Sequence, residues 1–212
     1  MALATLALLP AISQIIYDKP NNILDRVSIG LARQSGNCTV IVSNTEKDIV
    51  TKKQIEAGFN SILDQCQNHA GQNPLFKMVY VEVQNRQARH DTNFFPPRVL
   101  TCGLNRNAPL TADKDCQTLF DSIPVDKQGR LSSTFKTFKT CTILLYTTDD
   151  SPLIAKKSDI APVVSDMIKG CKGKSGVISL TKGASGNNGL AVVKLRSSKL
   201  CGDGSDSLQV CL

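Results

Sequence analysis

Apolar residues recur at the same helical spacing in two stretches of the chain. The first set is Ile55, Phe59, Ile62, Leu63 and Cys66, and the second is Ile160, Val164, Met167, Ile168 and Cys171. Both sets follow the offsets i, i+4, i+7, i+8 and i+11, which lie on one stripe of an amphipathic helix. The pattern predicts two helices, each with an apolar face and a closing cysteine turned toward a core.

Capping residues predict where these helices begin. Thr51 followed three residues later by Gln54 is the pattern of a capping box at the first helix. Ser158 can cap the second helix, and Pro162 then falls early enough in that helix to be tolerated.

Strand patterns flank both helices. Alternating apolar residues predict two strands before each helix, at 27–31 and 39–42 in the first case and at about 129–138 and 142–146 in the second. A hairpin is expected after each helix, from 76–83 with a strand near 98–101, and from 177–180 with 190–195 around the turn at Asn188-Gly189. We therefore expect an α+β fold of two tandem β-β-α-β-β units, each an antiparallel sheet with a helix packed on one face. A short helix is predicted at 111–123, and its assignment to either unit stays open.

Eight cysteines fall into two similar sets of four. The sets are Cys38, Cys66, Cys102, Cys116 and Cys141, Cys171, Cys201, Cys211. The first member of each set opens a Cys-Thr phrase, and the third opens a Cys-Gly pair. The shortest gap between cysteines is ten residues and there is no Cys-x-x-Cys, which argues against a structural zinc site. Disulfide bonds and an oxidising compartment are the better interpretation.

The helix stripes indicate which cysteines pair. Because a closing cysteine on the stripe faces the sheet, we expect the pairs Cys38–Cys66 and Cys141–Cys171, each joining a strand to its helix. A loop of about thirty residues closed in this way stabilises by roughly 3–4 kcal/mol in the chain-entropy model. For the other four cysteines, Cys102–Cys116 and Cys201–Cys211 are the expected pairs, although each of these could equally reach a neighbouring strand.

The N-terminal residues are apolar and lack charged side chains. The run at 2–9 is followed by Pro10 and the small residues around Ala11–Ser13, which is the pattern of a signal peptide except for its missing basic segment. The expected organisation is a signal peptide at 1–13, a first α+β unit at 20–101, a second at 102–200 and a cysteine-containing tail at 201–212. A secreted, extracellular protein follows from this prediction.

The formal net charge is +7, with lysines and arginines scattered along the chain and densest at 169–182. One interpretation is a solvated basic surface, and the other is attraction to an anionic membrane or cell-wall polymer. Aromatic residues are not interleaved with the basic ones as in single-strand binders, so no nucleic acid is expected. The expected partner is an unknown host protein or an anionic surface, and the oligomeric state stays open.

Catalytic, cofactor and metal sites are not expected. Gly183–Asn187 lacks the spacing of a nucleophile elbow, and Gly173-Lys174-Ser175 lacks the first glycine of a phosphate loop. His69 and His90 are the only histidines, and eight paired cysteines would leave no free thiol nucleophile. The acidic pairs Asp113/Asp115 and Asp149/Asp150 are interpreted as solvated loop acids.

The segment from Cys102 to about Arg196 resembles the necrosis-inducing-factor domain of the extracellular-protein-2 effectors, a family of secreted fungal proteins. The matching features are Cys102-Gly103, Asp115-Cys116 opening a short helix, Lys139–Ile143 on a strand, and a helix ending at Cys171. The broader pattern is similar to killer-toxin-like α/β sandwiches. The resemblance implies secretion, host interaction and in some members plant cell death, and it supplies no catalytic residues.

Three functional hypotheses follow. The leading one is a secreted, non-enzymatic fungal effector that acts on a host as a virulence or necrosis-inducing factor. The first alternative is a killer-toxin-like antimicrobial protein that acts on competitor membranes or channels. The second alternative is a secreted hydrolase or hydrolase inhibitor.

Overall fold

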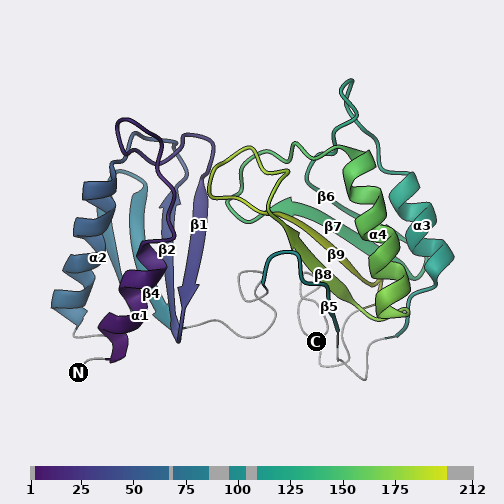
Figure 1. Ribbon diagram of the computed structural model, residues 1–212, viewed down its shortest axis with the longest axis horizontal. Helices are drawn as coiled ribbons and strands as arrows, with labels where there is room; N and C mark the ends of the chain where they lie inside the picture. Colours follow the sequence, from purple (N-terminus) through teal and green to yellow (C-terminus); the bar gives the residue numbers. More distant parts are fainter. Residues whose placement is uncertain (1–2, 67–68, 86–95, 104–108, 200–212) are drawn as a thin grey trace. The chain divides into compact units, whose positions relative to one another are not determined.

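The computed structural model describes residues 3–66, 69–85, 96–103 and 109–199 (Figure 1). The chain divides into two compact units. The first comprises Met1–Ala88 together with two short later segments, Thr148–Ser151 and Ser185–Gly189. The second comprises Arg89–Thr147, Pro152–Ala184 and Leu190–Leu212.

The first unit is a four-stranded antiparallel sheet with two helices. Its elements are α1 (Leu3–Ile12), β1 (Gly30–Ser35), β2 (Cys38–Asn44), α2 (Lys52–Cys66), β3 (Gly71–Phe76) and β4 (Val79–Asn85). The strand order is β1-β2-β4-β3, with every neighbouring pair antiparallel. Helix α1 packs on β1 and β2, whereas α2 packs on β3 and β4 (Figure 1).

Period-two alternation builds the core of the first unit. Val40 and Val42 on β2 and Val81 on β4 point to the helix-covered face, where each is at most 1 % exposed. Ile55 and Phe59 on the α2 stripe meet them and are fully buried. The predicted apolar helix face therefore lies on the sheet.

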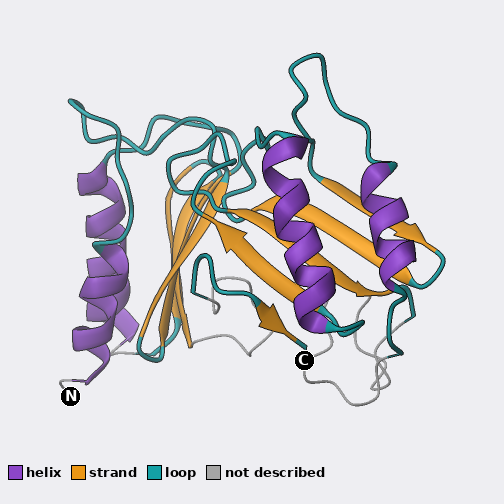
Figure 2. Cartoon of the chain, turned by 45° about the vertical axis from the view of Figure 1, so that its right-hand side comes forward, coloured by secondary structure: helices purple, strands orange, loops and turns teal. Residues whose placement is uncertain are grey.

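The second unit is a five-stranded antiparallel sheet, also with two helices. Its elements are β5 (Thr101–Cys102), α3 (Asp113–Asp121), β6 (Thr134–Phe138), β7 (Cys141–Thr147), α4 (Lys157–Cys171), β8 (Gly176–Leu180) and β9 (Ala191–Ser197). The strand order is β5-β8-β9-β7-β6. Figure 2 shows the two helices side by side on one face of this sheet, with α3 over β6 and β7 and α4 on β5 and β8.

The predicted fold class is confirmed. Both units contain a β-β-α-β-β series, β1-β2-α2-β3-β4 in the first and β6-β7-α4-β8-β9 in the second. The short helix predicted at 111–123 is α3, which belongs to the second unit. Helix α1 is its counterpart, because each packs on the first two strands of its own series.

The capping predictions have different outcomes. At α2 the capping box is confirmed, since the Gln54 amide donates to Thr51 Oγ1 over 3.3 Å and the Thr51 amide donates to Gln54 Oε1 over 2.9 Å. At α4 the prediction of a Ser158 cap is wrong. Lys156 is the N-cap residue, and Ser158 Oγ instead contacts Asp159 Oδ1 at 3.4 Å.

Three strand predictions made for the first unit differ from the structure. The stretch 76–83 is not one strand, because the chain turns at Lys77, whose φ is 45°, and divides it between β3 and β4. The strand predicted near 98–101 as the hairpin partner is instead β5, which pairs with β8 in the second unit. The strand predicted at 27–31 begins only at Gly30.

The apolar N-terminal run forms helix α1, and part of it lies in the core. Leu8 is 1 % exposed, Ala11 is fully buried and Ile12 is 7 % exposed. Cleavage of residues 1–13 stays a prediction, as do the boundaries at 20–101, 102–200 and 201–212. Across the described ranges, no helix is both long and apolar enough to cross a membrane.

Candidate functional site

Two disulfides fasten the helices of the second unit to its sheet. Cys116 on α3 is bonded to Cys141, the first residue of β7, and Cys171, the last residue of α4, is bonded to Cys102 on β5. The Cα atoms are 5.2 Å apart in both pairs. Their sequence separations of 25 and 69 residues correspond to about 3.5 and about 4.4 kcal/mol in the chain-entropy model.

The predicted pairs Cys141–Cys171 and Cys102–Cys116 are therefore wrong. The strand order gives the physical reason. Cys141 begins β7, which lies under α3, whereas α4 packs on β8 and β5. A helix stripe determines which face of a helix meets a sheet, but not which strand lies beneath a given residue.

The predicted pair Cys38–Cys66 is also wrong, for the same reason. Both residues are free, half-buried thiols. Cys38 begins β2, one of the two strands on which α1 packs. Cys66 ends α2, which packs on the other two strands, β3 and β4. Burial raises the pKa of the Cys38 thiol above its ordinary value. The predicted pair Cys201–Cys211 lies outside the described residues.

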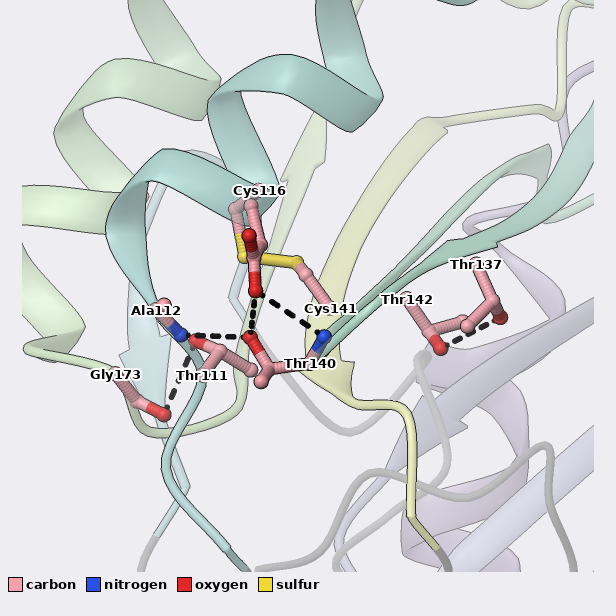
Figure 3. The surroundings of a disulfide bond; sticks show 9 residues. Thr111, Ala112, Cys116, Thr137, Thr140, Cys141, Thr142 and Gly173 are labelled. Carbon is pink, nitrogen blue, oxygen red and sulfur yellow. Dashed lines mark hydrogen bonds between the residues drawn. A yellow bond between two sulfur atoms is a disulfide. The ribbon is translucent and has the colours of Figure 1, made fainter.

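One end of the second unit brings three chain segments together around the Cys116–Cys141 bond (Figure 3). The Ala112 amide donates to Thr140 Oγ1 over 2.9 Å, and Thr140 Oγ1 donates to Asp115 Oδ2 over 2.7 Å. These bonds join the start of α3 to the turn between β6 and β7.

The loop after α4 reaches the same place. The Thr111 amide donates to the Gly173 carbonyl over 2.8 Å. A side chain at position 173 would bring a Cβ atom to 2.8 Å from the Thr111 carbonyl oxygen, and the backbone there has φ 77°. Glycine therefore allows this close approach.

We call the lysines on these three segments the basic end. They are all exposed, and they are Lys114, Lys139, Lys169, Lys172 and Lys174. Asp113 and Asp115 are the acidic residues beside them, so five positive and two negative charges leave a net charge of +3. The Thr140 hydroxyl chiefly lowers the pKa of Asp115 by donating to the carboxylate, and Lys139 and Lys114 lower it further.

The basic end supports two physical interpretations. Lys169 lies in the last turn of α4, where a cation complements the helix dipole. Lys172, the C-cap residue of α4, lies at the same end of the helix dipole, and Lys139 Nζ lies 5.3 Å from the centre of the Phe138 ring. An excess of positive charge on converging segments attracts anions and anionic surfaces. Sequence reasoning noted the density of lysine at 169–182 but could not show that Lys114 and Lys139 would join it.

The interpretation of Asp149 as a solvated loop acid is wrong. Asp149 belongs to the first unit and is fully buried. Its carboxylate accepts hydrogen bonds from Ser28 Oγ at 2.6 Å and from Ser151 Oγ at 2.7 Å. Burial raises the pKa of the neighbouring Asp150 above its ordinary value, and the negative charge of Asp149 raises this pKa further.

A second buried carboxylate lies in the same cluster of the first unit. Asp25 accepts from the Ser28 backbone amide at 2.8 Å, and its Oδ2 lies 2.8 Å from Ser28 Oγ, so the single hydroxyl hydrogen of Ser28 is shared between Asp25 and Asp149. The strand predicted at 27–31 did not allow for this turn, in which Asp25 Oδ1 also accepts from the Val27 amide at 3.1 Å; an Asp that accepts from the backbone two residues on is typical of turns. Glycine is required at position 186, because a Cβ there would collide with both Asp149 Oδ2 and Ser28 Oγ. These hydrogen bonds give the buried Asp25 and Asp149 carboxylates a structural role in the fold of the first unit.

The remaining candidate residues are not brought into a site. His69 is exposed after α2, where its amide donates to the Cys66 carbonyl over 2.9 Å. His90 lies outside the described residues. Within the portion of the chain that is described, no group of three or more His, Cys, Asp or Glu residues is arranged to hold a metal ion.

Comparisons with known proteins identify no family for this chain. No family model matches the chain, and no curated protein matches it. Among solved structures, the chain is similar to the tandem DUF26 ectodomain of the Arabidopsis thaliana cysteine-rich receptor-like protein PDLP5, at 10% identity over 93% of this chain and 90% of that one, with a TM-score of 0.31. A likeness at that TM-score carries no argument about fold or function.

Proposed function

We propose that this chain is an extracellular, non-catalytic binding protein that engages an anionic surface through the basic end of its second unit. The observation that carries the proposal is the convergence of three lysine-bearing segments. The Thr111–Gly173 and Ala112–Thr140 hydrogen bonds hold them together, and the Cys116–Cys141 disulfide fixes them to the sheet.

The disulfides support the extracellular part of the proposal. Bonds of this kind persist in oxidising compartments and are rare in reducing ones. Cys116 and Cys141 are 1 % exposed and fully buried, so the bond belongs to the core of the second unit. We expect reduction of this disulfide to loosen the packing of α3 on β7. The lysines of the basic end would then be held together less firmly.

The expected affinity can be estimated from the charges. A lysine close to an anionic membrane contributes about 1 kcal/mol, and the attraction falls off over a Debye length of about 8 Å at physiological salt. A net charge of +3 then corresponds to about 3 kcal/mol before the costs of association. Binding should therefore be weak, dependent on salt and insensitive to the stereochemistry of the anion.

Neutralising two lysines tests the proposal. Replacing Lys172 and Lys174 together by glutamine removes two charges from the basic end. The matched control replaces Lys53 and Lys127, which are also exposed and lie outside it. Binding is measured at two salt concentrations in separate arms, with vesicles containing anionic phospholipid and with a soluble polyuronate.

The basic-end variant should lose about 2 kcal/mol of binding free energy, which is about a thirty-fold loss of affinity. This loss is expected in each arm in which the unchanged protein binds. The control should bind within about two-fold of the unchanged protein, apart from the small effect of net charge. Equal losses in both variants would mean that overall charge, and not this site, drives the attraction. No binding in either arm refutes an anionic partner.

A secreted effector that acts on a host is the finer form of this proposal. It rests on the resemblance of 102–196 to the necrosis-inducing-factor domain. Infiltrating the purified protein and the basic-end variant into leaves tests it, and necrosis with the former but not the latter is expected. If no host responds, the effector role is contradicted. The anion-binding proposal is tested separately by the vesicle and polyuronate assay. The antimicrobial and hydrolase alternatives stay predictions.

A further inference from the structure

The outer edge of strand β6 is unpaired in the second unit. This strand is last in the order β5-β8-β9-β7-β6, and among the described residues no other strand lies beside it. Phe138 and Cys141 form the pair that closes the β6–β7 hairpin, and hydrogen-bonded pairs alternate with non-bonded ones along an antiparallel ladder. The amide and carbonyl groups of Phe135 and Thr137 therefore point away from β7, toward the open edge.

The other edge strands of the two sheets are protected. At β1, Arg33 Nε donates to the Gln14 carbonyl and the Gln14 side-chain amide donates to the Gln34 carbonyl, each over 3.2 Å. Strand β3 contains Pro74 and a register shift after it, and β5 pairs at only two positions. Proline, bulges and short strands are the usual means of blocking an edge. Strand β6 contains no proline and its pairing with β7 has no register shift, so it is open to strand addition.

The side chains of β6 alternate between the two faces of the sheet. Lys136 opposes Ile143 of the helix-covered core, so the Lys136 side chain lies on that face. Phe135 and Thr137 lie on the helix-free face, where the Thr137 hydroxyl is 2.8 Å from the Thr142 hydroxyl (Figure 3). Phe135 is 50 % exposed. An added strand would therefore meet an aromatic ring on one face and a lysine on the other.

The charge on this edge disfavours a second copy of β6 as the added strand. An antiparallel pairing that uses both outward residues of each copy sets Phe135 of one copy opposite Thr137 of the other. The two Lys136 side chains then lie directly opposite each other, and like charges in that position destabilise a strand pair. The segment 131–140 contains two lysines and no acidic residue. The electrostatic complement of this edge is therefore an acidic strand.

We propose that the outer edge of β6 binds an extended, acidic peptide segment of a partner protein as an added antiparallel strand. Main-chain hydrogen bonds to Phe135 and Thr137 supply affinity, and the alternating side chains supply specificity. An acidic residue of the peptide lies opposite Lys136, and aromatic or β-branched residues lie opposite Phe135 and Thr137. The site does not use Lys172 or Lys174, so this inference goes beyond the proposed anion binding.

Synthetic peptides of about eight residues, the length of an ordinary strand, test the proposal. The probe alternates glutamate with valine or tyrosine, and a charge control has lysine in place of every glutamate. A backbone control has the sequence of the probe with N-methylated valines, which lack the amide hydrogens that would face β6. Affinity for the full-length protein is measured by calorimetry, and exchange of the Phe135 and Thr137 amides is followed by NMR.

The probe should bind and slow exchange of the Phe135 and Thr137 amides by about ten-fold or more. The charge control should bind about five-fold more weakly and the backbone control about ten-fold more weakly. The proposal is overturned if the probe does not bind, if all three peptides bind equally, or if binding leaves exchange at these amides unchanged. Slow exchange of both amides in the free monomer, or only in a dimer, would identify a different occupant of the edge and also overturn it.

Substitutions at Thr137 separate the backbone contact from the side chain. Thr137→Pro removes an amide hydrogen that points to the open edge, a place where a strand tolerates proline. Thr137→Val is the matched control, because it removes the same hydroxyl and keeps the amide hydrogen. Affinity for the probe should fall about ten-fold in Thr137→Pro and change by less than about two-fold in Thr137→Val. Equal affinities of two folded variants would contradict strand addition.

A charge reversal gives a second readout that leaves the backbone unchanged. Lys136→Glu should reverse the preference, so that the lysine peptide binds more tightly than the probe, and an unreversed preference overturns the proposal. The double variant Lys172→Gln, Lys174→Gln should bind the probe within about two-fold of the unchanged protein. A large loss in that double variant would place the peptide on the basic end instead. Failure of the proposed function would appear in the vesicle and polyuronate assay and would leave these peptide affinities unchanged.

Discussion

Helix α1 gives the sharpest prediction about the first unit, because two adjacent leucines differ in burial. Leu8 is 1 % exposed and belongs to the core, whereas Leu9 is 57 % exposed. Truncating each to alanine makes the same chemical change in the same helix. Comparing the two variants therefore distinguishes the contribution of α1 packing to stability from the contribution of its helix propensity.

The expected magnitudes differ widely. A buried leucine replaced by alanine costs about 2–5 kcal/mol, because transfer energy is lost and a cavity is left. An exposed leucine replaced by alanine usually changes stability by less than about 0.5 kcal/mol. A chain that begins at Gln14 also loses the buried Ala11 and Ile12, which adds about 2–4 kcal/mol. Domain stabilities are typically about 5–15 kcal/mol, so that chain should be marginal in its first unit.

Native-state hydrogen exchange followed by mass spectrometry measures these effects. Peptides that cover β2 and β4 report on the first unit, and peptides that cover β7 and β9 serve as an internal control. Leu8→Ala should reduce the protection of β2 and β4 by about thirty-fold or more, and Leu9→Ala by less than about three-fold. Equal protection in the two variants would refute the packing of α1 on the sheet. If protection in the chain that begins at Gln14 is unchanged, α1 contributes nothing to this core.

Two further predictions concern hydrogen-bonded groups. Gly186→Ala should lower the free energy of unfolding by about 1–3 kcal/mol, because its Cβ would collide with buried Asp149 and Ser28; an unchanged urea midpoint would contradict this placement. Thr140→Val removes the hydroxyl that donates to Asp115, so the pKa of Asp115, measured by NMR titration, should rise toward its ordinary value of 3.8. Because the folded pKa is lowered, the stabilisation is complete above 3.8 and is lost as the pH falls through the folded pKa. A pKa that does not move on substitution would mean that this hydrogen bond does not form in solution.

The hydrophobic pattern was sufficient to predict the fold class. The stripes ending at Cys66 and Cys171 predicted both main helices, because one face of each meets a sheet. The turn at Lys77 was missed, since it uses a lysine with positive φ and contains no glycine, proline or asparagine. The run at 2–9 is apolar on all sides, so it carried no helical period that would predict the packing of α1.

The cysteine pairing could not be predicted for a different reason. Periodicity shows that Cys171 faces a sheet, but its partner depends on which strand lies beneath the end of α4. That strand order arises from long-range pairing, which places β5, from before α3, beside β8. The basic end likewise depends on tertiary contacts, because the Ala112–Thr140 and Thr111–Gly173 hydrogen bonds join its three segments only in the folded unit.

Disulfide mapping of the second unit shows directly whether the bonds Cys116–Cys141 and Cys102–Cys171 fasten its two helices to the sheet. Trypsin places Cys102 in peptide 99–106, Cys116 in 115–127, Cys141 in 140–156 and Cys171 in 170–172. This pairing requires that peptide 115–127 is linked to 140–156 and that peptide 99–106 is linked to 170–172 in the oxidised protein. A link between 140–156 and 170–172, the pair that the helix stripes favoured, would contradict it.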